Sequence, residues 1–205
     1  MKPAQVEYFF SFRSPYSYLS AARAFELPQR YNVDLVWRGV RPMAMRGQPV
    51  PRAKQLHILR DAAREARRLG IPFGPMHDPI GDGVWRCLTI AEHAVRIGRT
   101  AQFVTTAARA IWSDAADVTR DDSLRAICER AGLDWPQCQR AMIHAPYRER
   151  VEKNTSRLAE LGQWGVPTFV LEDRAFWGQD RIEDLERALG AAGLVRTQMD
   201  EEKAA

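Results

Sequence analysis

The pattern of apolar positions at the start of the chain predicts a strand, a helix and a second strand. The first strand is indicated by a run of β-branched and aromatic residues: Val6, Tyr8, Phe9, Phe10 and Phe12. The helix, expected from Pro15 to about Gln29, is indicated by apolar residues at helical spacing: Tyr18, Leu19, Ala22, Phe25 and Leu27. Residues 33–37 then alternate like a second strand. This order predicts a βαβ unit with parallel strands.

From residue 54 to about 162 the pattern is helical. The expected helices cover roughly 53–69, 85–98, 100–113, 122–131, 135–144 and 147–162. Two more strands are expected at 168–172 and 174–177. A last helix from about 180 to 192 carries a capping box formed by Asp180 and Glu183. The whole order is that of one sheet with a helical subdomain inserted between its βαβ and ββα halves.

Two irregular segments interrupt this pattern. Residues 39–51 form a loop punctuated by proline and glycine, which carries Arg41, Arg46 and Gln48. Residues 73–84 form the longest irregular stretch, with three prolines and with glycines at 74, 81 and 83. A stretch of this kind is either the rim of a pocket or a passive connector, and the pattern favours neither.

Composition narrows the class of protein. The chain has 205 residues, of which 45% are hydrophobic and 27% charged, so it can form an ample globular core. The net charge is +4, but basic and acidic residues are interleaved, and no basic run carries interspersed aromatics. We therefore expect no nucleic-acid partner, whereas a small anionic substrate fits the basic surplus.

The cysteines and the N-terminus bear on the compartment. Cys87, Cys128 and Cys138 form no C-x-x-C pair, which fits a reducing compartment and structural thiols better than a disulfide framework. No signal segment precedes the first strand, and no apolar stretch is long enough to span a bilayer. We expect a cytoplasmic protein that has no membrane partner and no metal site.

The junction between the first strand and the first helix places Ser14 at a helix N-terminus. Unpaired backbone N–H groups and the helix dipole favour negative charge there. Ser14 is therefore either a helix N-cap or a residue whose hydroxyl faces a bound anion. The strand and helix pattern alone leaves both interpretations open.

A second junction stands just before the third strand, at Gly165-Val166-Pro167-Thr168. A proline at a strand entrance removes a hydrogen-bond donor and is a candidate for a cis peptide bond. A cis bond would turn the backbone of Val166 outward, where an extended peptide could pair with it. A trans proline that merely starts an edge strand is the alternative.

Three motifs together resemble a known family. They are Ser14-Pro15-Tyr16-Ser17-Tyr18-Leu19, Gly165-Val166-Pro167-Thr168 and Phe176-Trp177-Gly178-Gln179-Asp180-Arg181. The chain resembles the 2-hydroxychromene-2-carboxylate isomerases, which are related to kappa-class glutathione transferases and DsbA-like thioredoxin folds. The resemblance implies an α/β thioredoxin-like domain formed by 1–40 and 163–195. It also implies an all-helical domain inserted at 41–162 and a polar C-terminal tail at 196–205.

A polar patch agrees with this resemblance. Lys54, His57, Asp61 and Arg64 lie at i, i+3, i+7 and i+10, on one helix face. Taken alone, the patch is a solvated face with a weak Asp61–Arg64 ion pair. The resemblance makes Lys54 a candidate ligand for a carboxylate of glutathione or substrate, and we expect it to face the same cleft as Ser14.

The resemblance implies glutathione as cofactor and Ser14 as the catalytic residue. Redox relatives have a cysteine at this position, and a hydroxyl cannot form a disulfide. Ser14 can instead donate a hydrogen bond to the glutathione thiolate. Lowering a thiol pKa of about 8.5 by ~2 units requires ~2.7 kcal/mol, which is the size of one charge-assisted hydrogen bond plus the helix dipole.

The remaining roles are also implied by the resemblance. Val166 and Pro167 would hold the glutathione backbone. The γ-glutamyl end would be held by Trp177, Gly178, Gln179 and Asp180, of which Asp180 is equally a candidate helix cap. An aromatic keto-acid substrate needs an apolar slot and a cation. The candidates are Trp85, Trp112, Trp177, Arg46, Gln48 and Lys54, and each tryptophan has a place in the core as its alternative.

The chain departs from the family pattern at several positions. His57 stands where the family has tyrosine, Ser11 where it has an acidic residue, and Arg46 and Gln48 where it has lysine and asparagine. These changes leave the substrate open. The leading hypothesis is a homodimeric glutathione-dependent isomerase of an aromatic-catabolic intermediate. The alternatives are a kappa-like glutathione transferase or peroxidase, and a glutathione-binding protein without turnover.

Overall fold

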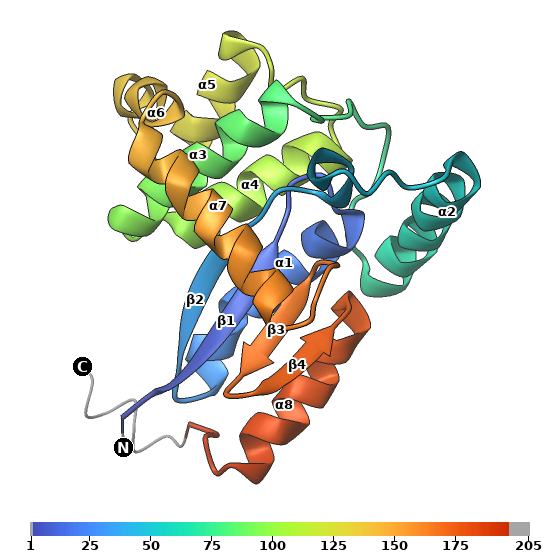
Figure 1. The fold of residues 1–205 in the computed structure, drawn as a ribbon, viewed down its shortest axis with the longest axis vertical. Coiled ribbons are helices and arrows are strands. Elements are labelled where there is room, and N and C mark those ends of the chain that lie inside the picture. The colour runs from blue at the N-terminus through green and yellow to red at the C-terminus, as the bar shows by residue number, and fades with distance from the viewer. Residues whose placement is uncertain (1, 197–205) are drawn as a thin grey trace.

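A four-stranded mixed sheet forms the centre of the protein, whose computed structural model describes residues 2–196. Strand β1 (Ala4–Phe10) lies parallel to β2 (Val33–Gly39) and antiparallel to β3 (Thr168–Leu171), which pairs with β4 (Arg174–Trp177). The strand order β2-β1-β3-β4 places the first two strands of the sequence and the last two in one sheet (Figure 1).

Strand β1 is buried because its apolar run packs on both faces of the sheet. Tyr8 stacks on Phe169 of β3 at 4.7 Å between ring centroids, while Phe9 packs with Leu158 on the other face. The apolar pattern indicates a strand as far as Phe12, but the strand ends at Phe10. The amide of Ser11 donates to the Ser17 hydroxyl instead of continuing the ladder, although Phe12 is still buried.

Helix α1 (Pro15–Arg30) begins with proline in its first turn, as predicted, because the missing N–H costs nothing there. Its buried face carries Leu19, Ala21, Ala24 and Leu27. The expectation that Ala22 and Phe25 belong to this face was wrong, and both are exposed. Small alanines at positions 21 and 24 allow the helix to pack closely on its neighbours.

The inserted region is helical, as expected, with ends that differ by a few residues. It contains a 3-10 turn (Met43–Arg46) and six helices: α2 (Arg52–Leu69), α3 (Asp82–Arg96), α4 (Thr100–Trp112), α5 (Asp121–Arg130), α6 (Trp135–Met142) and α7 (Ala145–Glu160). Helices α3 to α6 form a lobe above the sheet, α7 runs from the lobe onto it, and α2 stands to one side (Figure 1). One continuous hydrophobic core joins lobe and sheet. The domain boundaries stay a prediction.

After β4 the chain makes a 3-10 turn (Gln179–Arg181) before α8 (Ile182–Ala191). The predicted Asp180/Glu183 capping box was wrong. The turn places Arg181 before the first helical residue, and no side chain caps the helix. The predicted polar tail lies almost entirely outside the described residues.

Cys87, Cys128 and Cys138 are free thiols, each fully buried in the helical lobe. Burial raises the pKa of Cys87 to about 12. Across residues 2–196 no helix combines the length and apolar character needed to cross a membrane. The same residues hold no cluster of three His, Cys, Asp or Glu side chains that could bind a metal ion.

Candidate functional site

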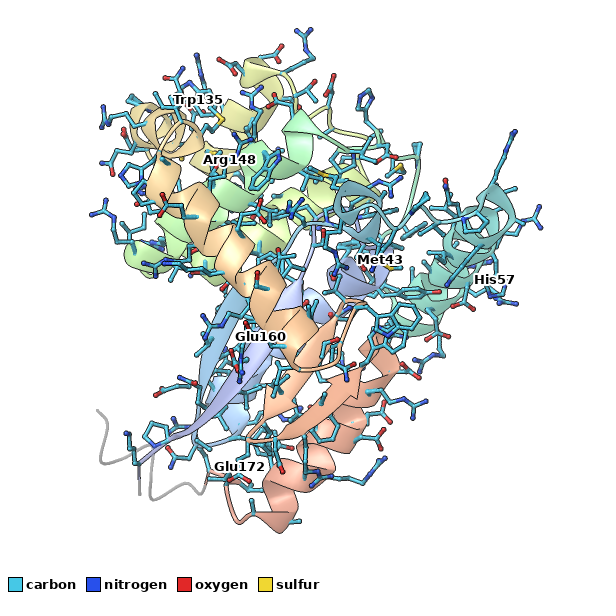
Figure 2. The ribbon with its side chains drawn as sticks, in the orientation of Figure 1. Met43, His57, Trp135, Arg148, Glu160 and Glu172 are labelled. Carbon is cyan, nitrogen blue, oxygen red and sulfur yellow. The ribbon has the colours of Figure 1, made fainter. Side chains whose placement is uncertain are left out.

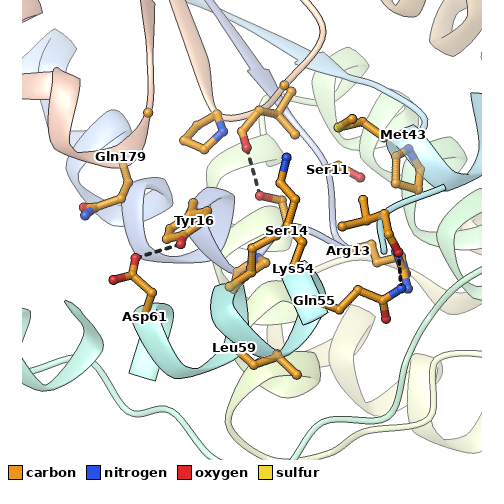
Figure 3. A pocket seen from close by; sticks show the side chains of 18 of the residues that line it. Ser11, Arg13, Ser14, Tyr16, Met43, Lys54, Gln55, Leu59, Asp61 and Gln179 are labelled. Atoms are coloured by element: carbon orange, nitrogen blue, oxygen red, sulfur yellow. Dashed lines mark hydrogen bonds between the residues drawn. The ribbon is translucent and has the colours of Figure 1, made fainter. Parts of the chain in front are cut away.

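A cavity of about 920 Å³ opens where the N-terminus of α1, the loop before β3, the turn after β4 and helix α2 meet (Figure 3). The sheet creates this meeting point. Because β1 and β3 are antiparallel neighbours, the segment that follows β1 lies beside the segment that precedes β3. Ser14 and Val166, 152 residues apart in the chain, therefore line the same cavity.

The hydroxyl of Ser14 has two partners. Its oxygen accepts a hydrogen bond from the Ser17 amide at 3.1 Å, which makes Ser14 the N-cap of α1. Its hydrogen is donated to the carbonyl oxygen of Val166 at 3.0 Å. Both interpretations of Ser14 thus have a structural basis, because the cap residue also lies on the cavity wall.

The loop before β3 is joined to the end of β4. The Val166-Pro167 peptide bond is cis, and the Pro167 carbonyl accepts a hydrogen bond from the Gly178 amide at 2.9 Å. The indole of Trp177 lies so close to Gly165 that a Cβ at that glycine would be 2.3 Å from Nε1. Trp177 is about half exposed, and its indole forms an apolar surface beside Val166.

Helix α2 forms the facing wall. Lys54, His57 and Asp61 all line the cavity, which confirms the prediction that Lys54 and Ser14 share it. Asp61 accepts hydrogen bonds from the Tyr16 hydroxyl at 2.7 Å and from Arg64 at 2.8 Å. These bonds hold the pKa of Asp61 below its usual value, the Tyr16 bond most strongly. The predicted Asp61–Arg64 ion pair is present.

The Trp177-Gly178-Gln179-Asp180 motif borders the same cavity. Gln179 is buried and donates its amide to Glu65 of α2 at 2.9 Å, while its own Oε1 is buried without a partner in the described part of the chain. Asp180 is exposed and forms an ion pair with Arg181 at 3.3 Å. An unpaired acceptor beside two carboxylates suits a ligand that brings hydrogen-bond donors.

The unpaired charges on the cavity wall are cations. Every lining carboxylate has an ion-pair partner: Asp61 with Arg64, Glu65 with Arg68, Asp78 with Arg13 and Asp180 with Arg181. Lys54 and Arg46 line the cavity, and neither pairs with a carboxylate among residues 2–196. Burial and the neighbouring Arg41 lower the pKa of Arg46. The cavity therefore favours an anionic ligand.

The predicted substrate residues divide into two groups. Arg46 and Trp112 line the cavity, although Trp112 is mostly core: it is buried and donates its Nε1–H to the Phe12 carbonyl at 3.0 Å. Trp85 and Gln48 are not on the cavity wall. Trp85 lies under the guanidinium of Arg148, 4.2 Å from its ring centroid, and Figure 2 shows Arg148 on the lobe, far from His57 of α2. Gln48 is exposed on the loop before α2.

An ion pair beside Ser14 was not predicted from the sequence. Arg13 forms a two-pronged ion pair with Asp78, with both contacts at 2.7 Å. The partners are 65 residues apart, so no local pattern relates them. Because Asp78 and Met76 line the cavity, the irregular segment before α3 is a rim of the pocket and not a passive connector.

Comparison with known proteins agrees with this architecture. A family model described as the DSBA-like thioredoxin domain matches residues 5–190. The chain belongs to this family. Three relatives named 2-hydroxychromene-2-carboxylate isomerase, two from Pseudomonas and one from Sphingobium xenophagum, are 25–26% identical, over 90–91% of this chain and 91–97% of theirs. Human glutathione S-transferase kappa 1 is 26% identical over 92% of each chain.

Solved structures show the same fold. A 2-hydroxychromene-2-carboxylate isomerase superposes with a TM-score of 0.78 at 24% identity, covering 92% of this chain and 95% of the other. The cytosolic disulfide reductase DsbM from Pseudomonas aeruginosa, solved with GSH, gives a TM-score of 0.67 at 20% identity, covering 90% and 98%. The predicted resemblance and thioredoxin-like fold are confirmed.

This DSBA-like domain has no cysteine on its cavity wall. The three thiols of the chain are buried in α3, α5 and α6. Dithiol exchange at this cavity would need a protein thiolate that the described residues do not supply. The hydroxyl of Ser14 at a helix N-terminus is instead suited to donate a hydrogen bond to an anion brought by the ligand.

Proposed function

We propose that the protein is a glutathione-dependent isomerase of an aromatic-catabolic intermediate of the 2-hydroxychromene-2-carboxylate or trans-o-hydroxybenzylidenepyruvate type. One observation carries the proposal: the Ser14 hydroxyl stands at the N-terminus of α1, on a cysteine-free cavity whose unpaired charges are cations. Three relatives carry the name of this isomerase, and a DsbM structure of the same fold was solved with GSH.

Glutathione fits the distribution of polar groups along the cavity. In our proposal its γ-glutamyl end lies at Trp177, Gly178, Gln179 and Asp180, where the buried Oε1 of Gln179 would accept a hydrogen bond from the amino group. Its backbone pairs with Val166 and packs on Pro167, which brings the thiol to Ser14. Lys54 receives a carboxylate.

The energy available for ionising the thiol is modest. A hydrogen bond to a thiolate contributes about 1.5–3 kcal/mol, but Ser14 gives up its neutral bond to Val166, worth about 0.5–1.5 kcal/mol. The net gain of roughly 1 kcal/mol plus the dipole of α1 lowers the thiol pKa by about one to two units. Starting from about 8.5, this is enough to make the thiolate a major species near neutral pH.

The reaction that we propose is reversible addition. The thiolate sulfur bonds to one carbon of the conjugated double bond of the keto acid, and the electron pair moves onto the carbonyl oxygen as an enolate. The former double bond can now rotate. Return of the electrons expels the thiolate and leaves the isomer, so glutathione is regenerated. Arg46 pairs with the substrate carboxylate, and Trp177 and the edge of Trp112 supply apolar surface.

The experiment is an absorbance assay of isomerisation with trans-o-hydroxybenzylidenepyruvate, with and without glutathione. The proposal requires turnover that depends on glutathione, and S-methylglutathione, which has no free thiol, must not support it. Binding of glutathione by calorimetry without any isomerisation would leave only a glutathione-binding protein.

The match to human glutathione S-transferase kappa 1, at an identity equal to that of the isomerases, supports a second candidate. A kappa-like transferase or peroxidase would use the same activated thiol on another electrophile. Conjugation of 1-chloro-2,4-dinitrobenzene, or reduction of a hydroperoxide, in preference to isomerisation would favour this candidate.

A further inference from the structure

The loop at residues 164–167 presents four consecutive carbonyl groups, and each accepts a hydrogen bond within the protein. Trp164 accepts from the Arg46 guanidinium, Gly165 from the Thr168 hydroxyl at 2.8 Å, and Pro167 from the Gly178 amide at 2.9 Å. Val166 accepts from the hydroxyl of Ser14 at 3.0 Å.

The donor to Val166 differs from the other three because its hydrogen is also needed for the proposed function. Ser14 and Arg46 both line the cavity, but only Ser14 must give to the thiolate the same hydrogen that it now gives to Val166. A serine hydroxyl has a single hydrogen, and its oxygen is already engaged as acceptor of the Ser17 amide. Ser14 therefore cannot donate to a ligand sulfur and to the Val166 carbonyl at the same time.

We propose that the Val166 carbonyl makes the site selective for peptide thiols, because a ligand backbone N–H can donate to that carbonyl and so compensate for the hydrogen bond that Ser14 gives up when it donates to the thiolate. This inference rests on the proposed function and concerns its specificity. Ser14 moves its hydrogen bond to the sulfur, the thiol proton passes to solvent, and the amide of the ligand cysteine takes the vacated place on Val166.

When a ligand lacks that amide, Ser14 cannot satisfy both the ligand sulfur and the Val166 carbonyl. If Ser14 stays on Val166, the sulfur loses its donor. If Ser14 turns to the sulfur, a partly buried carbonyl is left without its hydrogen bond, which is unfavourable. In either case the thiol pKa falls less than it does for glutathione. Simple thiols such as 3-mercaptopropionate should therefore be poor cofactors even at concentrations that fill the cavity.

The test compares glutathione with its depsipeptide, in which the γ-glutamyl–cysteine amide is an ester and its N–H is absent. Each thiol is titrated by its far-ultraviolet absorbance, free and bound at saturation, so that the shift is measured against the pKa of the same peptide in solution. With the wild-type protein we expect the bound ester to show a depression about one pKa unit smaller than that of bound glutathione.

Variants separate this exchange from a general loss of structure. In Ser14→Ala the two peptides should show equal pKa shifts, because no hydroxyl remains to be exchanged, whereas Ser14→Thr should restore the difference. Asp134→Ala is the matched control. It also removes a helix cap, from α6, where Asp134 accepts from the Gln137 amide at 3.0 Å, and it should leave both titrations unchanged.

Equal pKa shifts for the two peptides on the wild-type protein would overturn the exchange and leave the proposed function intact. Failure of glutathione itself to bind would count against the proposed function instead. A difference that persists in Ser14→Ala would show that the amide acts independently of Ser14 and would also overturn the inference.

Discussion

Gln179, in the turn after β4, donates its side-chain amide to Glu65 of α2 at 2.9 Å, across 114 residues of chain. Helix α2 buries only Ala62 and Ala66, so apolar packing holds it weakly. Within residues 2–196, the other side-chain hydrogen bond between α2 and the elements around the sheet is the one from Tyr16 to Asp61 at 2.7 Å. The wall of the cavity that carries Lys54 is therefore positioned mainly by two hydrogen bonds.

We predict that Gln179→Ala loosens α2. Removal of a hydrogen bond to a charged group costs about 1.5–3 kcal/mol, so amide hydrogens of α2 should exchange at least tenfold faster by mass spectrometry. Gln137→Ala, at an exposed glutamine on α6, is the control and should leave α2 unchanged. Unaltered exchange in Gln179→Ala would mean that Ala62 and Ala66 hold the helix unaided.

Ser14→Ala should raise the pKa of bound glutathione by about half a unit to one unit, since the thiolate loses the net gain of roughly 1 kcal/mol from Ser14 and keeps the contribution of the α1 dipole. Activity should fall at neutral pH and partly recover in alkaline buffer, where the thiol ionises unaided. Glutathione should still bind through Val166 and the Trp177–Asp180 motif. An unchanged pH–rate profile would reduce Ser14 to a helix cap.

The unpaired cations of the cavity should govern anion affinity. Lys54→Met is expected to weaken glutathione binding about threefold to tenfold, and to make it less sensitive to salt, because an exposed charge contributes about 1 kcal/mol. Arg46→Met should act mainly on the KM of the keto acid. Arg60→Met removes an equal charge from α2 outside the cavity and is the control. Equal effects of Lys54→Met and Arg60→Met would indicate only long-range electrostatics.

Gly165→Ala should disturb the loop before β3. The new Cβ would lie 2.3 Å from Nε1 of Trp177, so the indole must move away from the cavity wall. We expect a loss of about 1–3 kcal/mol of unfolding free energy and weaker glutathione binding. Gly190→Ala, whose Cβ would meet nothing within 4 Å in α8, should be neutral or stabilising. Full glutathione affinity in Gly165→Ala would show that Trp177 is dispensable.

The buried carboxyl of Glu92 should make stability depend on pH. Burial raises its pKa to about 7, although Arg150 and Asn154 partly oppose this, while an unfolded glutamate titrates near 4.3. The folded protein thus favours the protonated form. The resulting stabilisation is present below about pH 4 and is lost as the pH rises to about 7, by roughly 3 kcal/mol.

Glu92→Gln should remove this slope. Urea unfolding of the wild type and the variant between pH 4.5 and 7.5 measures the difference directly, because all other groups are common to both proteins. Glu129→Gln, at an exposed position, provides the control. Parallel pH profiles for wild type and Glu92→Gln would show that folding does not raise the pKa of Glu92.

The sequence located the parts of the site that lie at ends of regular elements. Ser14 follows β1 and Val166 precedes β3, and adjacent strands bring such ends together whatever the loops do. Trp85 shows the limit. A tryptophan on an amphipathic helix can face the core, the cavity or a neighbouring helix, and here Arg148 of α7 covers it. Only the packing of α3 against α7 settles that choice.

Contacts between distant segments were not predictable either. The Arg13–Asp78 and Gln179–Glu65 pairs join residues that no periodicity relates. The missed 3-10 turn after β4 has a local reason: Gly178 takes a φ of 131°, which turns the chain before α8 can start. As a result Asp180 faces the cavity instead of capping the helix.

The burial of every cysteine has a practical consequence for work on this protein. Cys87, Cys128 and Cys138 together make up all the thiols of the chain, and none is exposed to solvent. A thiol titration of the complex therefore has no contribution from cysteines of the folded protein. For the same reason, a maleimide added to the unliganded protein should react only when the helical lobe opens. The rate of labelling therefore measures the opening of the lobe.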